Sequence, residues 1–179
     1  PVFVRFTVLV PAGNFTPAVF TAGTSTVNLT NTGSVSANAF ATLNVTGGTR
    51  TATGNINAGA VTVTTPGVLA VEATTFGAAS VGGTGTVTAT SGTLNVSGNF
   101  TPAVFTAGTS TVVLTGTINL GAYTFNNLTV DTGTVTLTGN VNVNGILTGT
   151  GTVDAIATTL TVGGDFTPAV FTAGTSTVN

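Results

Sequence analysis

Asn14-Phe-Thr-Pro-Ala-Val-Phe-Thr-Ala-Gly-Thr-Ser-Thr-Val27 occurs three times in this chain. The peptide is repeated without change from Asn99 to Val112, and from Asp165 to Val178 with only its first residue altered. The sequence offsets between copies are 99 − 14 = 85 and 165 − 99 = 66, close to four and three units of about 21 to 22 residues. Repeats of this length are typical of a solenoid, which would have about eight coils in a chain of this size.

Apolar and polar residues alternate through most of the chain, as they do in half-buried strands. Clear examples are Val61 to Thr64, Thr93 to Ser97 and Thr134 to Thr138. The strands are expected to run four to seven residues and to end in Gly-Thr, Gly-Asn or Asp-Thr-Gly, which are turn sequences. The 3.6-residue period of a helix is missing, so the sequence predicts an all-β protein.

Short strands fit both a sandwich of hairpins and a coiled solenoid. The two offsets favour the solenoid, because only a solenoid needs each unit to return to the same angular position. In a parallel β-helix, inward side chains of successive coils stack about 4.8 Å apart, with Thr on the outward positions. We therefore expect a parallel β-helix with coils of about 21 to 22 residues. Residues 1–179 would form one domain, a slice of a longer repeat protein or the subunit of a fibre.

Charged residues make up only 3% of the chain, whereas 41% of its residues are hydrophobic and 44 are Thr. Disordered chains have the opposite balance, so this chain should fold. Cys and His are absent, which excludes disulfides and the usual zinc and haem sites. We expect no cofactor and no metal.

Two residues, Arg5 and Arg50, are the only cations. Binding to nucleic acid or to an anionic membrane requires a basic surface, so neither partner is expected. The apolar run from Val2 to Val10 is too short to span a bilayer, which needs about 20 residues. Its alternation predicts a strand with one apolar face (Val2, Val4, Val8 and Val10) and a second face that carries Arg5 and Thr7.

A family resemblance rests on three stretches, which run from Tyr123 to Gly139, from Leu160 to Thr167 and from Phe171 to Val178. They resemble the β-strand repeats of very long prokaryotic cell-surface and secreted proteins of the adhesin or autotransporter-passenger kind. The resemblance implies a right-handed parallel β-helix outside the cell, with a role in adhesion or surface structure. It implies no active-site residue.

The carboxylates are Glu72, Asp131, Asp154 and Asp165. A glycosidase needs two of them about 5 to 9.5 Å apart. The sequence separation of Asp131 and Asp154 is 154 − 131 = 23, so they could stack on neighbouring coils. The alternative that we favour places each at a corner, where Asp bonds its own backbone. We predict no catalytic residue. The glycine clusters at Gly82 and Gly163 lack the regular Asp of calcium-binding repeats.

Threonine arrays raise a further alternative, because a flat ladder of Thr-x-Thr pairs is expected of an ice-binding solenoid. The pairs fall at irregular offsets, and outward Thr is also the ordinary surface of an uncharged strand. They are Thr62/Thr64, Thr86/Thr88, Thr109/Thr111, Thr134/Thr136, Thr136/Thr138, Thr159/Thr161 and Thr175/Thr177.

Asn-x-Ser/Thr sequons mark possible N-glycosylation sites. A chain so rich in Asn and Thr also contains sequons by chance. They lie at Asn14, Asn28, Asn44, Asn95, Asn99 and Asn127.

These patterns favour a non-enzymatic, extracellular, structural or adhesive β-solenoid, either a surface protein or a filament subunit. We expect it to self-associate, because bare β-edges without charges invite pairing, and surface glycans are a further expected partner. The alternative from another class is a carbohydrate-binding or carbohydrate-cleaving β-helix. Tyr123 is the only Tyr and Trp is absent, so few rings are available to stack on sugars.

Two expectations test the fold directly. Each repeated peptide carries two Phe around a Pro, and we expect the Pro to mark a corner and at least one Phe to be buried against an adjacent coil. The sequence separation of Arg50 and Glu72 is 72 − 50 = 22. A coil of that length would stack them as a surface ion pair.

Overall fold

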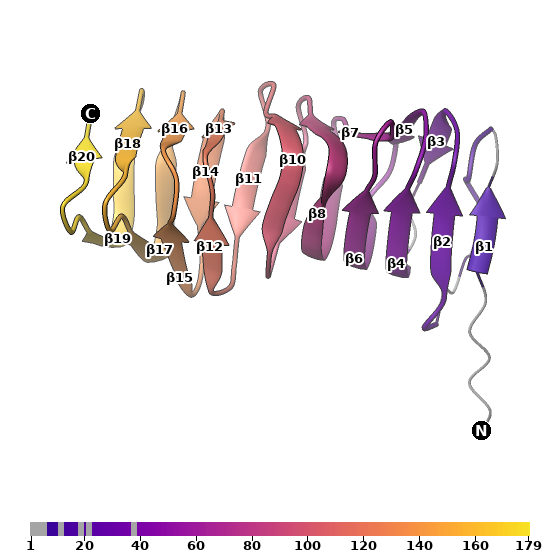
Figure 1. The fold of residues 1–179 in the computed structure, drawn as a ribbon, viewed down its shortest axis with the longest axis horizontal. Coiled ribbons are helices and arrows are strands. Elements are labelled where there is room, and N and C mark those ends of the chain that lie inside the picture. The colour runs from indigo at the N-terminus through magenta and orange to yellow at the C-terminus, as the bar shows by residue number, and fades with distance from the viewer. Residues whose placement is uncertain (1–6, 11–12, 18–19, 21–22, 37–38) are drawn as a thin grey trace.

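The structure is a computed structural model that describes residues 7–10, 13–17, 20, 23–36 and 39–179. Strands and turns account for the ordered elements of these ranges, which contain no helix. Every strand pairing is parallel, and the strands stack as a β-solenoid of about nine turns (Figure 1). The predicted all-β parallel solenoid is therefore confirmed.

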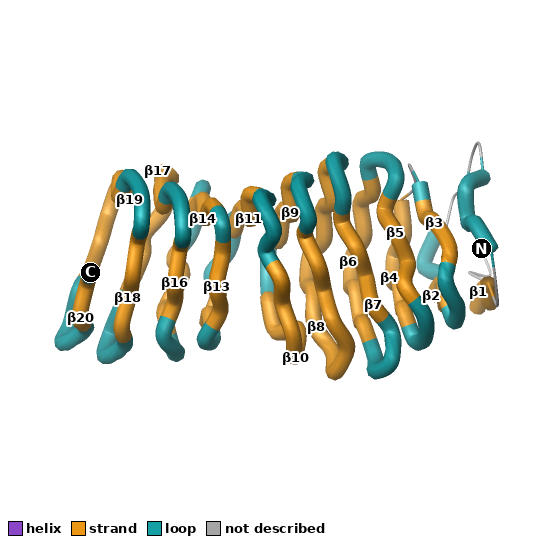
Figure 2. The backbone as a smooth tube through the Cα atoms, turned by 90° about the horizontal axis from the view of Figure 1, so that it is seen from above, coloured by secondary structure: helices purple, strands orange, loops and turns teal. Residues whose placement is uncertain are grey.

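Successive strands form two sheets, of 16 and four strands. The larger sheet comprises β1 (Thr7–Val10), β2 (Thr26–Leu29), β3 (Gly33–Val35), β4 (Ala39–Val45), β5 (Thr49–Ala52), β6 (Ile56–Val63), β7 (Val68–Val71), β8 (Thr75–Ala89), β9 (Thr93–Val96), β10 (Phe100–Thr106), β11 (Thr111–Leu114), β12 (Ile118–Leu120), β14 (Asn127–Val130), β15 (Thr134–Leu137), β17 (Leu147–Asp154) and β19 (Phe166–Thr172). The smaller sheet comprises β13 (Tyr123–Phe125), β16 (Val141–Val143), β18 (Thr159–Val162) and β20 (Thr177–Val178), which lie side by side in Figure 2.

Alternating burial confirms the period-two pattern of the sequence. Short strands such as β9, β11 and β14 alternate between partly buried outward residues and buried inward ones. One inward column runs through Val27, Leu43, Val61, Val81 and Phe100, one residue from each successive coil. All five are buried, and each fully buried side chain of this kind contributes about 1.5 to 3 kcal/mol.

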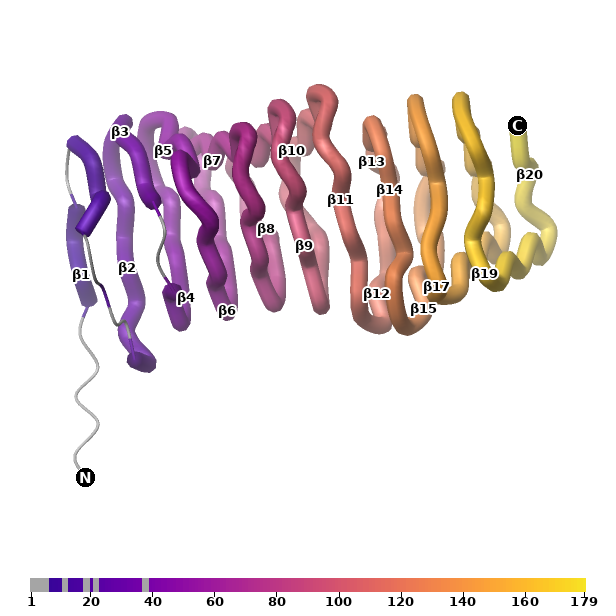
Figure 3. Tube along the Cα trace, turned by 180° about the vertical axis from the view of Figure 1, so that it is seen from behind, coloured from indigo at the N-terminus to yellow at the C-terminus, as the bar shows by residue number. Residues whose placement is uncertain are grey.

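The coils are shorter than the predicted length of about 21 to 22 residues. Val27 pairs with Leu43 on the next coil, a sequence separation of 43 − 27 = 16, and Val61 pairs with Val81, a separation of 81 − 61 = 20. Figure 3 shows these coils following one another from β1 to β20. The predicted coil length was wrong because it assumed that every copy of the repeated peptide occupies the same face.

The three copies in fact lie at different angular positions. The register places Val27 four coils before Phe100 in the same column. Phe15, which occupies the place of Phe100 in the first copy of the peptide, lies 27 − 15 = 12 residues before Val27 in the sequence. Three coils back from Phe166, the register leads to Val112, whereas the equivalent Phe100 precedes Val112 by 112 − 100 = 12. Each offset therefore exceeds a whole number of coils by about two-thirds of a coil, so one peptide serves different faces of the solenoid.

The expectation of at least one buried Phe in each copy holds for the second copy of the peptide, whereas the Phe rings of the other two copies are at most partly buried. Phe100 is fully buried and meets Phe105 edge to face, with ring centroids 5.1 Å apart. Phe15 and Phe20 repeat this geometry at 5.1 Å as partly buried residues packed on the core. In the third copy Phe171 packs on the core, whereas Phe166 is 37% exposed.

Proline does not separate two strands in the second and third copies. Pro102 lies within β10 opposite Gly83, and Pro168 lies within β19 opposite Gly149. The register shifts just after each Pro, as at a β-bulge, where a residue without an N–H is tolerated. In these two copies the predicted corner is therefore a bulge in a continuous strand, whereas Pro17 of the first copy lies outside the strands.

The predicted ion pair between Arg50 and Glu72 is wrong. Arg50 pairs in register with Leu69, a separation of 69 − 50 = 19, and Glu72 follows Val71, which pairs with Ala52. Arg50 points inward and is fully buried, whereas Glu72 is exposed. The spacing of the two residues in the sequence therefore does not bring their side chains together.

At the N-terminal end, Val8 and Val10 of β1 face the core and Thr7 faces outward, as predicted. The other residues of the predicted strand, Val2 to Phe6 with Arg5, lie outside the described residues.

Candidate functional site

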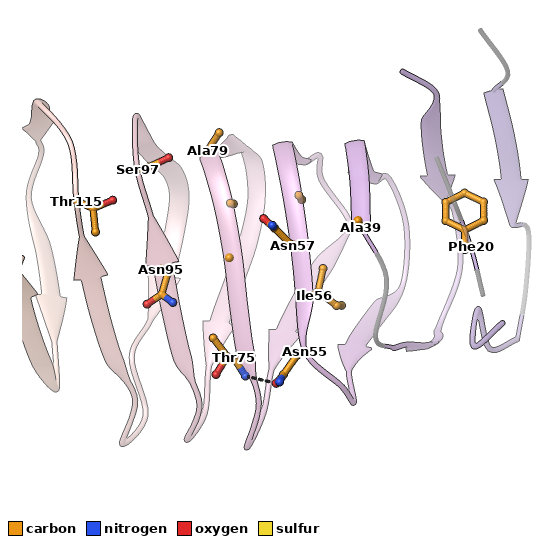
Figure 4. Close-up of a pocket in the computed structure, with 13 residues that line it drawn as sticks. Phe20, Ala39, Asn55, Ile56, Asn57, Thr75, Ala79, Asn95, Ser97 and Thr115 are labelled. Carbon is orange, nitrogen blue, oxygen red and sulfur yellow. Dashed lines mark hydrogen bonds between the residues drawn. The ribbon is translucent and has the colours of Figure 1, made fainter. Parts of the chain in front are cut away.

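A shallow groove of about 870 Å³ runs across the outer surface of β6, β8 and β9. Figure 4 shows it extending from Phe20, near the N-terminal end, to Thr115, which follows β11. Side chains of Asn, Thr, Ser, Ala, Ile and Phe line it, and none of the described lining residues is charged. The groove therefore offers an uncharged surface with both polar and apolar parts.

Three residues in one outward column form the centre of the groove. Asn57 of β6 pairs in register with Gly77 of β8, and Gly77 pairs with Asn95 of β9. Two amides thus lie on either side of a residue without a side chain. Figure 4 shows both Asn side chains on the strands that flank β8.

The amides of Asn57 and Asn95 have no hydrogen-bond partner among the described residues, although other outward Asn side chains do. Asn44 Nδ2 donates to Asn28 Oδ1 at 2.8 Å. Asn142 Nδ2 donates to Asn144 Oδ1 at 3.0 Å. The two amides in the groove are therefore free to bond a ligand through both a donor and an acceptor.

One edge of the groove is held by a bond between coils. The backbone N–H of Thr75 donates to Asn55 Oδ1 at 3.0 Å, drawn as a dashed line in Figure 4. Asn140 accepts from Thr159 N in the same way at 2.9 Å. The opposite edge carries Ala79 and Ser97, both exposed. One edge of the groove is thus held by a side-chain bond between neighbouring coils, and the opposite edge is formed by small side chains.

The single Tyr has a structural position rather than an exposed one. Tyr123 donates its hydroxyl to the Pro102 carbonyl oxygen at 2.9 Å, and its ring lies 5.1 Å from that of Phe100. Burial raises the pKa of Tyr123. It borders a second, smaller hollow of about 390 Å³, together with Asn142 and Thr161.

The two carboxylates considered as a catalytic pair do not stack on each other. Asp154, the last residue of β17, pairs in register with Thr136. Asp131 instead lies beside Thr150, whose hydroxyl bonds the Asp131 carbonyl oxygen. Asp131 lies in the turn between β14 and β15 that ends at Gly133, as the corner interpretation predicted, whereas Asp154 lies in a strand and not at a corner. Within the described ranges, no group of three His, Cys, Asp or Glu residues could hold a metal.

The sequons occupy several structural settings. Asn14 and Asn99 are exposed, although Asn14 Oδ1 accepts from Ser34 N at 3.0 Å. Asn127 Oδ1 accepts from Ile146 N at 3.0 Å. The remaining three, Asn28, Asn44 and Asn95, lie on outward strand positions and are partly buried.

The Thr-x-Thr pairs do not align into one continuous array. Thr62 pairs with Gly82, Thr136 with Asp154, and Thr161 with Asn142. Some members do stack on Thr, as Thr159 does on Thr177, but the pairs form no unbroken ladder of the kind that the ice-binding alternative requires.

Comparison with known proteins found no matching family model, no matching curated protein and no matching solved structure. In the part of the chain that the structure describes, no helix is long and apolar enough to cross a membrane.

Proposed function

We propose that this chain is a non-enzymatic, extracellular, structural and adhesive β-solenoid of a surface protein. The observation that carries the proposal is the uninterrupted parallel stack with an outer surface of Thr, Asn, Ser and Gly. A stack of this kind is stiff and presents regular faces, which suits a scaffold or a binding surface. The resemblance to prokaryotic surface repeats agrees with this location.

The arrangement of the carboxylates supports a non-enzymatic role. Asp131 and Asp154 lie beside Thr150 and Thr136 rather than beside each other. Arg50, the one cation that the structure describes, is buried in the core and does not face an open site. Glycoside hydrolysis needs two carboxylates about 5 to 9.5 Å apart.

Antibody labelling of the source cells tests the location. We expect intact cells to bind an antibody raised against this chain, and brief protease treatment to remove the signal. Labelling that requires permeabilised cells would contradict an extracellular role.

We also infer that exposed Asn99 carries an N-linked glycan where the host has that pathway. Its neighbour Phe100 is inward and buried, whereas Asn99 and Thr101 are exposed. Treatment of native protein with an N-glycan amidase should reduce its mass and convert Asn99 to Asp. An unchanged mass at this peptide in material from such a host would refute the assignment.

Self-association with a second copy of this chain is the second part of the proposal, because only 3% of the residues are charged and charge repulsion between copies is therefore weak. In two copies of the repeated peptide a third ring covers the Phe pair, at Phe40 in one and at Phe125 in the other. The pair Phe166 and Phe171 has ring centroids 5.0 Å apart and no third ring among the described residues. A second copy that covers this pair would make a head-to-tail contact, which builds a closed ring or an open filament according to the rotation between copies.

Sedimentation velocity at increasing concentration tests the association. We expect oligomers that grow with concentration, and electron micrographs of rods longer than one molecule. The substitution Phe166→Ser should shift the distribution to monomer, whereas Val104→Ser, at a 50% exposed side chain away from that end, should not. A wild-type protein that stays monomeric at all concentrations would contradict self-association.

A further inference from the structure

We propose that the groove centred on Asn57, Gly77 and Asn95 binds a neutral glycan. This inference deepens the proposed adhesive function by naming the class of ligand, and it therefore rests on that function. Three features of the groove support it, namely the glycine, the free amides and the absence of charge.

Gly77 has no structural requirement to be glycine. Most glycines with described surroundings either have a positive φ or would place a Cβ within 3.0 Å of a neighbouring atom. The exceptions are Gly77, in the middle of β8, and Gly121, which lies outside the strands. The nearest atoms to a Cβ on Gly77 would be Asn57 Oδ1 at 3.5 Å, Ile56 O at 3.7 Å and Asn57 Cγ at 4.0 Å, which are ordinary contacts.

A side chain at this position would favour the strand, since glycine in a strand interior costs about 0.5 to 1 kcal/mol. Glycine in such a place commonly marks a point where a ligand approaches the backbone closely. The bare surface at Gly77 lies at the centre of the groove, between the two free amides. Access for a ligand therefore explains a glycine that the fold itself does not need.

The free amides lie two coils apart, which places them about 9 to 10 Å from each other at the strand spacing. Each offers one acceptor and two donor hydrogens. The hydroxyl groups of a sugar both donate and accept, so an oligosaccharide laid along the groove meets both amides and the Ser97 hydroxyl. Ala39 and Ala79, which line the groove and are exposed, supply a small apolar surface for its C–H groups.

The lack of charge selects the kind of glycan. Among the described residues, no Asp, Glu, Lys or Arg lines the groove, so a sulfated or carboxylated glycan would lose hydration without gaining an ion pair there. The volume of about 870 Å³ is within the usual range of ligand sites, about 300 to 1,000 Å³. A short neutral oligosaccharide is the occupant that this chemistry fits.

Titration calorimetry with maltohexaose, cellohexaose and xylohexaose tests the proposal, with a heparin hexasaccharide as the charged comparison. We expect at least one neutral probe to bind the whole chain and the charged probe not to bind. Gly77→Thr should weaken that binding at least tenfold, because the new side chain fills the centre of the groove. Asn57→Ala combined with Asn95→Ala should weaken it to a similar extent.

Asn119→Ala is the matched control, because Asn119 is an exposed outward Asn in β12 that does not line the groove. Its binding should equal that of the wild type, and thermal unfolding should show that all variants are folded. The proposal fails if no neutral probe binds, if the heparin probe or an extended peptide binds instead, or if Gly77→Thr binds as the wild type does. Cell-surface labelling would be unaffected by any of these results, so the failure of this inference is distinguishable from that of the proposed function.

Discussion

Arg50 extends across the position of Gly33, from the third coil to the carbonyl oxygens of the first. Gly33 pairs in register with Arg50 and provides no side chain at that point of the inward column. Arg50 Nη1 donates to the Gly13 carbonyl oxygen at 2.6 Å, and Nη2 donates to the Val10 carbonyl oxygen at 3.1 Å. A long side chain in one coil thus occupies the space left by a glycine in the coil before it.

Burial of the Arg50 guanidinium costs desolvation free energy, and its two hydrogen bonds offset only part of that cost. The side chain is fully buried, its Nε has no hydrogen-bond partner, and no carboxylate among the described residues forms an ion pair with it. Desolvation lowers the pKa of Arg50. Two carbonyl bonds to a charged donor recover about 1.5 to 3 kcal/mol each, so the contribution of Arg50 must depend substantially on filling the space.

Shortening Arg50 should therefore destabilise the protein more than removing its charge. Arg50→Ala leaves a cavity and should lower the free energy of unfolding by about 2 to 5 kcal/mol. Arg50→Met fills most of the space with an unbranched chain and should cost less than about 1.5 kcal/mol. Urea unfolding measures both, with outward-facing Thr51→Ala as a control near zero. Equal losses for Ala and Met would show that the hydrogen bonds stabilise this region, rather than the packing.

Gly33 should tolerate no side chain. A Cβ there would fall on the Gly13 carbonyl oxygen and 2.7 Å from Arg50 Nη1. We expect Gly33→Ala to lower stability by about 1 to 3 kcal/mol, the usual cost of overpacking. Gly77→Ala is the matched comparison, since its Cβ meets only ordinary contacts, and it should leave the melting temperature unchanged or raise it. A neutral Gly33→Ala would mean that Arg50 can move aside.

The copies of the repeated peptide should differ in how much each Phe stabilises the fold. Phe100 and Phe166 occupy the same place in the peptide, but Phe100 is fully buried and Phe166 is 37% exposed. We expect Phe100→Ala to cost about 3 to 5 kcal/mol and Phe166→Ala less than about 1 kcal/mol. Both values come from chemical unfolding at a concentration low enough to exclude association. Similar losses would indicate that the third copy is buried in the monomer in solution.

The strands and their inward faces could be predicted from the sequence, because alternation in segments such as Thr134 to Leu137 reports burial directly. The angular position of each coil could not. Phe15, Phe100 and Phe166 have the same local sequence but stand on different faces, because the offset between copies depends on every corner in between.

The candidate site was missed for a related reason. The sequence contains 25 glycines, and only the contacts around each show that Gly77 is not required by the backbone. Asn95 was singled out as a sequon, whereas Asn57 was not, and their common column depends on the register through Gly77. Likewise, Arg50 can be buried because its register partner on the preceding coil is Gly33.

The coil length itself can be tested with engineered disulfides, because the chain has no Cys of its own. Thr42 and Ala60 are register partners on β4 and β6, with a sequence separation of 60 − 42 = 18. Parallel partners lie about 4.8 Å apart, within the Cα range of about 4.4 to 6.8 Å that a disulfide spans. Thr42→Cys with Ala60→Cys should therefore oxidise within the monomer.

Thr42→Cys with Thr64→Cys is the comparison, since its sequence separation, 64 − 42 = 22, is the one that the longer coil would require. Thr64 follows β6, four residues beyond Ala60, about 13 Å along an extended chain, which is too far for a bond. Non-reducing electrophoresis and titration of free thiols distinguish the two pairs. Efficient oxidation of the second pair, with free thiols in the first, would contradict the register between β4 and β6 and restore the longer coil at this end of the solenoid.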